Sequence, residues 1–276
     1  MNSSEKQSSK SETKKLNRII FLIGIVIVNF VINLVVYWWG SKNPEQSSKI
    51  YIYYENVNLL VWSILATFSF FALLRSFKIN TTAGKVWLFL GTGLLCWLIG
   101  DIYWAYYELI LYEISPFPSI ADYFYTLGYL FLFIGVYLQL KLANIKLSKI
   151  EIIIVIVFEV ILMIFSLIYL IIPILQYPIS EEFTIVQLFY SLLYPIADLI
   201  LAPFTIQLIL KYKGGRFSRV WLLISLGFIT SIFADLIFSY LEWNGYQVYW
   251  NFIDHLFIGY SMIFTIGAQY LKQILQ

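Results

Sequence analysis

Long apolar runs separated by short polar segments make up most of this chain. Several runs reach about eighteen or more apolar residues, which is enough for a helix to cross a hydrocarbon core of about 30 Å. Run length and polar punctuation together predict eight transmembrane helices, over residues 17–39, 57–77, 85–111, 120–141, 149–175, 184–211, 218–242 and 250–272. The fold class that we predict is an all-α integral membrane protein.

The polar segment before the first apolar run is low in complexity. Residues 1–16 are rich in Ser, Lys and Glu, which predicts a disordered cytoplasmic tail. The apolar run from Ile19 to Trp39 is longer than the core of a typical signal peptide, and no small-residue cleavage site follows it. We therefore interpret it as an uncleaved first span.

Basic residues mark one side of the predicted spans. All of the 18 Lys and Arg residues except Lys42 and Lys49 fall on the side that holds both termini. The positive-inside rule places that side in the cytoplasm, so we expect a multi-pass protein of the cell membrane with cytoplasmic N- and C-termini. The loops on the other side are rich in Glu, which favours an approaching cation.

The second half of the sequence repeats the first. Ungapped alignment pairs residues 85–108 with 219–242 and residues 119–135 with 251–267. Acids, glycines and aromatic residues coincide at Gly93 with Gly227, Asp101 with Asp235, Tyr106 with Tyr240, Glu108 with Glu242, and Asp122 with Asp254. Because each copy holds an even number of spans, both enter the membrane in the same direction. We predict two parallel four-helix repeats, at residues 17–143 and 144–276.

Composition excludes several function classes. Hydrophobic residues make up 61% of the chain and charged residues 12%. A single Cys96 and a single His255 exclude disulfides within the chain and metal sites that need several Cys or His ligands, so no cofactor or metal is expected. A net charge of +2 with dispersed basic residues indicates no nucleic-acid partner. No Lys or Arg lies mid-span, which excludes a retinal pigment.

Three aspartates lie deep within the predicted spans. Asp101 and Asp235 each lie about 24 Å along a helix from its cytoplasmic start, inside the outer leaflet. Asp198 lies near the bilayer middle, between Pro195 and Pro203. Ionisable groups at such depths are costly and mark functional sites by default. The structural alternative is a carboxylate satisfied by Tyr hydroxyls or by backbone groups across the two halves.

Four further acids lie nearer the outer surface. Asp122 follows Ser119, and Asp254 follows Asn251, at the spacing of a helix N-cap, which explains both structurally. Glu108 and Glu242 fall near helix C-termini, where the dipole disfavours negative charge. Either the N-terminal ends of the following helices or a bound cation or amine compensates them.

Aromatic residues make up 20% of the chain and gather near the predicted outer rim. Trp104, Tyr106 and Tyr240 are examples. An interfacial belt is one interpretation, and the lining of a cavity for an apolar ligand is the other. His255 follows Asp254 and is either an interfacial hydrogen-bonding group or a pH-sensitive contact.

One segment carries a distinctive motif, G-D-x-x-W-x-x-x-E followed by P-F-P-S-I-A-D-x-F-Y. Its residues are Gly100, Asp101, Trp104, Glu108, Pro116, Pro118, Ser119, Ala121, Asp122, Phe124 and Tyr125. The motif resembles the multi-span N-terminal sensory regions that precede archaeal and bacterial histidine kinases, PAS proteins and diguanylate cyclases. This resemblance implies a sensory role. No kinase, PAS or cyclase domain follows the last span in this sequence, so we expect the signal to pass to a separate cytoplasmic protein.

A second resemblance is to the lysoplasmalogenases, eight-span hydrolases of vinyl-ether lipids. It rests on G-L-L-x-x-x-x-G-D at residues 93–101, F-A-D at residues 233–235, and the late pair Tyr260 and Gln269. This resemblance implies that Asp101 and Asp235 are catalytic, one protonating the enol ether and the other activating water. The chain departs from that family at the His expected after G-D, near Tyr129.

The favoured hypothesis is a membrane sensory or ligand-binding module with an outward-facing acidic and aromatic pocket between the halves. Its predicted binding residues are Asp101, Asp235, Glu108, Glu242, Asp198, Asp122, Asp254, Trp104, Tyr106 and Tyr240. Membrane lipids, a cytoplasmic signalling protein and a small apolar or cationic ligand are the expected partners. A lysoplasmalogenase-like hydrolase is the alternative, and a small-solute or cation carrier, suggested by the parallel repeats, is the third.

Overall fold

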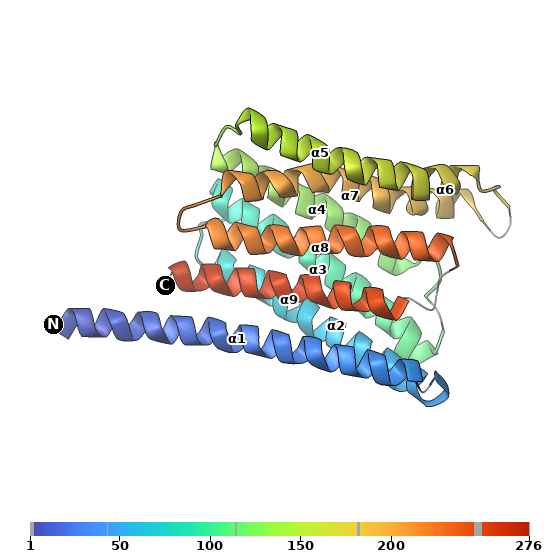
Figure 1. Cartoon of the computed structure of the whole chain (residues 1–276), viewed down its shortest axis with the longest axis horizontal. Helices are drawn as coiled ribbons and strands as arrows, with labels where there is room; N and C mark the ends of the chain where they lie inside the picture. Colours follow the sequence, from blue (N-terminus) through green and yellow to red (C-terminus); the bar gives the residue numbers. More distant parts are fainter. Residues whose placement is uncertain (1–2, 43, 114, 181–182, 246–249, 276) are drawn as a thin grey trace.

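The computed structural model describes residues 3–42, 44–113, 115–180, 183–245 and 250–275, and this part of the chain contains helices and no strands. The helices lie side by side along one direction (Figure 1). They are α1 Ser3–Lys42, α2 Pro44–Leu74, α3 Thr82–Tyr106, α4 Ile120–Ala143, α5 Lys149–Ser166, α6 Ile172–Gln176, α7 Ile185–Lys211, α8 Ser218–Trp243 and α9 Trp250–Leu275. Two π-helical segments, η1 Tyr107–Leu111 and η2 Leu167–Ile171, follow α3 and α5 directly.

Each predicted span coincides with a helical segment, but α1 and α2 begin well before the predicted starts at residues 17 and 57. Segments α5, η2 and α6 form one helical stretch where the sequence predicts a single span. In the described part of the chain, seven helices are long and apolar enough to cross a membrane. Helix α9 covers the eighth predicted span but is not among these seven, because polar residues such as His255 and Gln269 lower its hydropathy.

The N-terminal segment differs from the prediction. Residues 1–16 were expected to be disordered, whereas α1 begins at Ser3 and continues without a break to Lys42. Extending an existing helix adds about one hydrogen bond per residue without a new nucleation cost. Lys, Glu and Gln are also good helix formers, so the polar segment extends the apolar helix.

Side-chain caps fix where several helices begin. Thr81 accepts a hydrogen bond from the Gly84 amide at the start of α3. Capping boxes start α4, α5 and α7 through Ser119 with Asp122, Ser148 with Glu151, and Thr184 with Gln187. The structural interpretation of Asp122 is therefore confirmed. The matching prediction for Asn251 lies outside the described side chains.

Close helix crossings depend on glycine at aligned positions in the two halves. A Cβ atom added to any of these glycines would meet a side chain of the neighbouring helix. The four crossings are Gly93 on Leu132, Gly135 on Leu90, Gly227 on Phe264 and Gly267 on Ile224. The first two join α3 to α4, and the last two join α8 to α9 at the corresponding places of the sequence alignment.

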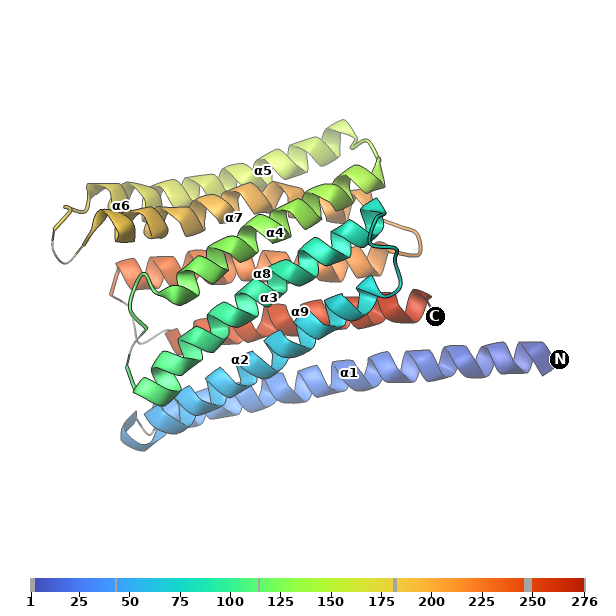
Figure 2. The ribbon, with the colours of Figure 1, turned by 180° about the vertical axis from the view of Figure 1, so that it is seen from behind.

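The helices form two layers that cross obliquely. Helices α2, α3 and α4 lie in front in Figure 2, with α7, α8 and α9 behind them. Helix α4 packs against α7, and α2 packs against α9. Between the layers, Trp87 stacks on Trp221 with ring centroids 5.5 Å apart, and Trp104 meets Phe238 edge-on at 6.4 Å. Both pairs join aligned positions of the two halves.

Both chain termini lie at the same end of the bundle (Figure 1). The connections over residues 75–81, 144–148 and 212–217 also lie there. These connections and the helix ends beside them carry most of the basic residues outside α1. The sequence-based sorting of Lys and Arg therefore corresponds to one physical end of the molecule.

Candidate functional site

A cluster of carboxyl and hydroxyl groups lies where α3, α4, α7 and α8 meet. Asp198 of α7 is 0% exposed, and its Oδ1 lies 2.7 Å from the hydroxyl oxygen of Tyr129 on α4. The same hydroxyl oxygen lies 2.6 Å from Oδ2 of Asp235 on α8. One tyrosine of the first half thus bridges two aspartates of the second half. We call Asp198, Tyr129 and Asp235 the bridged pair.

Asp101 lies beside the bridged pair on α3 and is 4% exposed. It accepts two hydrogen bonds, from Ser63 Oγ at 2.7 Å and from Tyr125 Oη at 3.1 Å. Asp101 is close enough to Asp235 for the two carboxyls to interact electrostatically, and the Tyr260 hydroxyl faces both. The structure therefore brings together the two aspartates that the alignment paired.

At the other contact between the halves, α2 on α9, the hydrogen bonds described between the two helices join hydroxyl and amide groups. Ser63 Oγ lies 3.4 Å from Ser261 Oγ, and Gln269 Nε2 donates to Ser69 Oγ at 2.9 Å. The small gap beside Ser63 and Ser261 has no space for a water molecule.

A second group of acids lies nearer the end opposite the termini. Glu108 in η1 accepts a hydrogen bond from Asn56 Nδ2 at 2.6 Å, and the side chain of Trp104 also bonds to it. Asp254 of α9 lies within electrostatic reach of Glu108 and of the buried Glu55. We call Glu55, Glu108 and Asp254 the outer acids.

Several predicted binding residues lie apart from both groups. Glu242 is exposed near the end of α8, although the aligned Glu108 is half-buried. Tyr106 is 47% exposed and packs on Tyr107. Tyr240 packs against aromatic rings of η2 and α5. Asp122 caps α4 and also accepts a hydrogen bond from Tyr194 Oη at 2.6 Å.

The sequence analysis named Tyr hydroxyls as possible partners of the buried acids but did not predict which residues supply them. Tyr125 and Tyr129 are one helical turn apart on α4, and both follow Asp122 on the same helix face at i+3 and i+7. That spacing could have identified the two tyrosines as site residues. Ser63 and Asn56 on α2 carried no comparable pattern, because neither belongs to a motif.

Neither group of acids is arranged as a metal centre. In the part of the chain that the structure describes, no group of three or more His, Cys, Asp or Glu side chains is placed to hold a metal ion. Among the described side chains, the one ion pair joins Lys213 to Glu151, on the end of the bundle that holds the termini. The hydrogen-bond partners described for the bridged pair and Asp101 are thus hydroxyl groups and not basic side chains.

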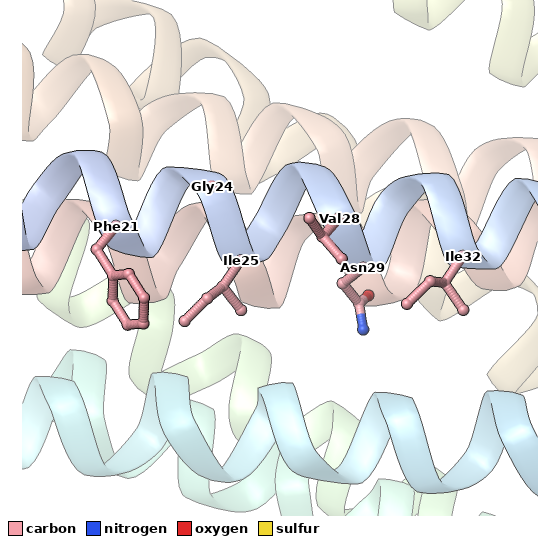
Figure 3. A pocket seen from close by; sticks show the side chains of 6 residues that line it. All are labelled: Phe21, Gly24, Ile25, Val28, Asn29 and Ile32. Atoms are coloured by element: carbon pink, nitrogen blue, oxygen red, sulfur yellow. The ribbon is translucent and has the colours of Figure 1, made fainter.

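An open apolar groove of about 450 Å³ lies along α1, away from the acids. Its lining residues are Phe21, Gly24, Ile25, Val28, Asn29 and Ile32. Their side chains project from one side of α1 (Figure 3). The lining is almost entirely apolar, which matches a helix surface covered by hydrocarbon.

Comparisons of the chain with protein-family models, with curated proteins and with solved structures gave no match.

Proposed function

We propose that this chain is a multi-pass membrane sensory module in which two parallel four-helix repeats meet at a buried carboxyl–tyrosine site. Seven described helices with the length and apolar composition of membrane spans support the membrane location. The basic residues at the end that holds the termini support a cytoplasmic position for that end.

Contacts at aligned positions support the duplicated architecture. The glycine crossings in α3–α4 recur in α8–α9, and the aligned pair Trp87 and Trp221 stacks between the layers. Such self-pairing of aligned residues is expected at a twofold axis, so we place an approximate axis between α3 and α8, along the membrane normal.

The observation that carries the sensory proposal is the bridged pair. Tyr129 belongs to the first repeat, and both of its carboxyl partners belong to the second. A ligand that binds these acids must compete with the Tyr129 hydroxyl, and binding therefore changes how the repeats fit together. A change of this kind shifts the population between two arrangements, which a cytoplasmic partner then detects at the basic loops.

The chemistry of the site favours a cationic ligand with an apolar part. Three aspartates converge with no basic side chain bonded to them among the described residues, and aromatic rings of Trp97, Tyr129 and Tyr260 surround them. Carboxylates with neighbouring aromatic faces suit ammonium groups. The outer acids lie between the central acids and the end opposite the termini, and their negative charge would attract such a ligand.

Short alkylammonium ions test this proposal. We expect them to raise the thermal stability of the purified protein in lipid nanodiscs, with the increase lost in Asp101→Asn and Asp235→Asn. The matched control is Glu242→Gln, which changes an exposed acid at the position aligned with Glu108. Equal stabilisation of all these variants, or none in the unaltered protein, would contradict a binding role for the central acids.

A hydrolase is the second candidate, favoured by one observation. Asp101 and Asp235, the aspartates matched by the lysoplasmalogenase resemblance, lie within electrostatic reach of one another. Two carboxyls in unlike surroundings divide into acid and base, as vinyl-ether hydrolysis requires. Release of aldehyde from lysoplasmalogen by the purified protein, abolished in Asp101→Asn, would replace the sensory proposal with this one.

A further inference from the structure

The two short contacts of the bridged pair need more hydrogen atoms than the tyrosine hydroxyl carries. The Tyr129 oxygen lies 2.7 Å from an oxygen of Asp198 and 2.6 Å from an oxygen of Asp235. Both distances are typical of full O–H···O hydrogen bonds. A tyrosine hydroxyl carries one hydrogen, and an ionised carboxylate carries none. The second hydrogen must therefore come from one of the two carboxyl groups.

Burial identifies the carboxyl that holds it. Asp198 is 0% exposed, and within the described part of the chain its Oδ2 has no hydrogen-bond partner. A buried ionised carboxylate with a bare oxygen is far more costly than a neutral acid. Asp235 is partly exposed, so its ionised form is less costly than that of Asp198. Asp198 is thus the donor to Tyr129, and Tyr129 donates to Asp235.

We propose that the bridged pair is a proton-binding site, with one proton held on the carboxyl group of Asp198, and that releasing this proton loosens the contact of α4 with α7 and α8. On release, two carboxylates compete for the single Tyr129 hydrogen, and one short contact is lost. The proton site stands on the hydrogen-bond geometry. Only its use as a signal rests on the proposed sensory function.

The surrounding groups fit this assignment. Two ionisable groups interact with Asp198: Tyr129 from α4 and Asp235 from α8. The groups that interact with Asp235 include Asp101 of α3, Tyr194 of α7 and Tyr260 of α9. All are acids or neutral hydroxyls, so no neighbouring positive charge favours ionised Asp198. Helix α5 also packs on α7 and carries Glu159, which no described contact joins to Asp198.

The corresponding place in the first repeat needs no extra proton. Asp101 aligns with Asp235, but its two oxygens accept hydrogens from two separate hydroxyl groups, Ser63 and Tyr125. Ser261 occupies the position that aligns with Tyr129. Proton binding is therefore a property of the α4–α7–α8 side alone, and Asp101→Asn is a matched control.

Infrared difference spectroscopy on nanodisc-embedded protein tests the assignment. We expect the unaltered protein to show the carbonyl band of a protonated carboxylic acid that shifts when aspartate is labelled with carbon-13. The band should disappear in Asp198→Asn and persist in Asp101→Asn. A labelled band that persists in Asp198→Asn but disappears in Asp254→Asn would overturn the assignment, as would the absence of any such band.

Hydrogen exchange tests the mechanical consequence and also covers a variant that does not fold. In the unaltered protein, after correction for intrinsic exchange, raising the pH should lower the protection of α4 and α7 amides while the acid band is lost. Asn at position 198 keeps a donor that cannot ionise, so in Asp198→Asn this protection should not depend on pH.

If that variant does not assemble, Tyr129→Phe should instead shift the labelled acid band by removing its hydrogen-bond acceptor. Protection that is independent of pH in the unaltered protein, or an acid band unchanged in Tyr129→Phe, would refute the switch. Alkylammonium binding tests the proposed ligand site and does not test the proton on Asp198. A failure of one proposal can therefore be told apart from a failure of the other.

Discussion

Asp101 and Asp235 accept hydrogen bonds from tyrosine and serine hydroxyls. Asp101 accepts from Ser63 and Tyr125, and Asp235 from Tyr129. Removing one of these hydroxyls leaves a carboxyl group under-bonded inside the protein. The Tyr129 hydroxyl is hydrogen-bonded to two carboxyl groups, and the Tyr125 hydroxyl is hydrogen-bonded to one. Losing the Tyr129 hydroxyl therefore removes more hydrogen bonds.

Tyr129→Phe should therefore destabilise the protein more than Tyr125→Phe. We expect a loss of about 1–3 kcal/mol for the larger effect, because a buried polar partner is left unsatisfied. Equilibrium unfolding in mixed detergent micelles measures both variants. A Tyr125→Phe effect equal to or above that of Tyr129→Phe would show that the bridge is not the stronger anchor.

Glycine at the helix crossings gives a second prediction at the residue scale. A Cβ at position 93 would overlap the Leu132 side chain and approach its backbone, whereas a Cβ at position 24 on α1 meets nothing within 4 Å. Gly93→Ala should cost about 1–3 kcal/mol through overpacking. Gly24→Ala is the matched control and should be neutral or slightly stabilising, because alanine is the better helix former. Equal unfolding midpoints for the two variants would contradict close packing at this crossing.

At the scale of elements, α1 contains the candidate membrane span with the smallest share of buried residues. Most of its apolar side chains are exposed, and it packs against α2 and α9. Polar side chains join it to α2: Asn29 Nδ2 donates to Asn58 Oδ1 at 3.0 Å, and Asn58 Nδ2 donates to Asn33 Oδ1 at 2.7 Å. Interhelical hydrogen bonds of this kind act as attachment points within a bilayer.

Asn58→Leu should loosen α1 without unfolding the bundle. The substitution introduces an apolar side chain of similar size and removes the three hydrogen bonds of Asn58 to Asn29 and Asn33 of α1, each contributing about 0.6 kcal/mol in a membrane. Hydrogen exchange should quicken across α1 and stay unchanged in α3 and α8. Val57→Leu, one residue away on an exposed face, is the control. Unchanged exchange in α1 would mean that the asparagines do not attach it.

The sequence predicted the elements well for a physical reason. A long apolar run is enough to predict that a membrane-spanning helix exists, and caps such as Ser119 with Asp122 are local. Side-chain partners were harder to predict, because they depend on how each helix is rotated and on which neighbour it meets. Tyr129 and Ser63 were missed for that reason, and Glu242 was grouped with Glu108 although only Glu108 finds a partner on α2. The depth of Asp101, Asp198 and Asp235 could be predicted, but the tyrosine bridge could not.

At the scale of the whole molecule, the bundle has two chemically distinct ends. The termini and the basic connections share one end, and the outer acids lie toward the other. A membrane protein with this distribution is oriented by its Lys and Arg residues. Lys146 and Tyr177 are exposed residues in connections at the two opposite ends.

Cysteine labelling tests that orientation. In a Cys96→Ala background, Lys146→Cys should react with a membrane-impermeant maleimide only when the cytoplasmic face is accessible. Tyr177→Cys should react in intact cells. Labelling of both positions from the same side would contradict the proposed topology. Labelling of Lys146→Cys, but not of Tyr177→Cys, in intact cells would show that the orientation is the opposite one.

The central claim is that the two repeats are held together by a tyrosine of one and the aspartates of the other. A double-mutant cycle on Tyr129→Phe and Asp198→Asn, read by equilibrium unfolding in lipid nanodiscs, tests it most directly. Residues that share a buried network couple by about 0.5–3 kcal/mol. The account predicts coupling in that range for this pair, and additive effects for Tyr129→Phe combined with Ser69→Ala on the opposite interface. Additive effects for Tyr129 and Asp198 themselves would contradict it.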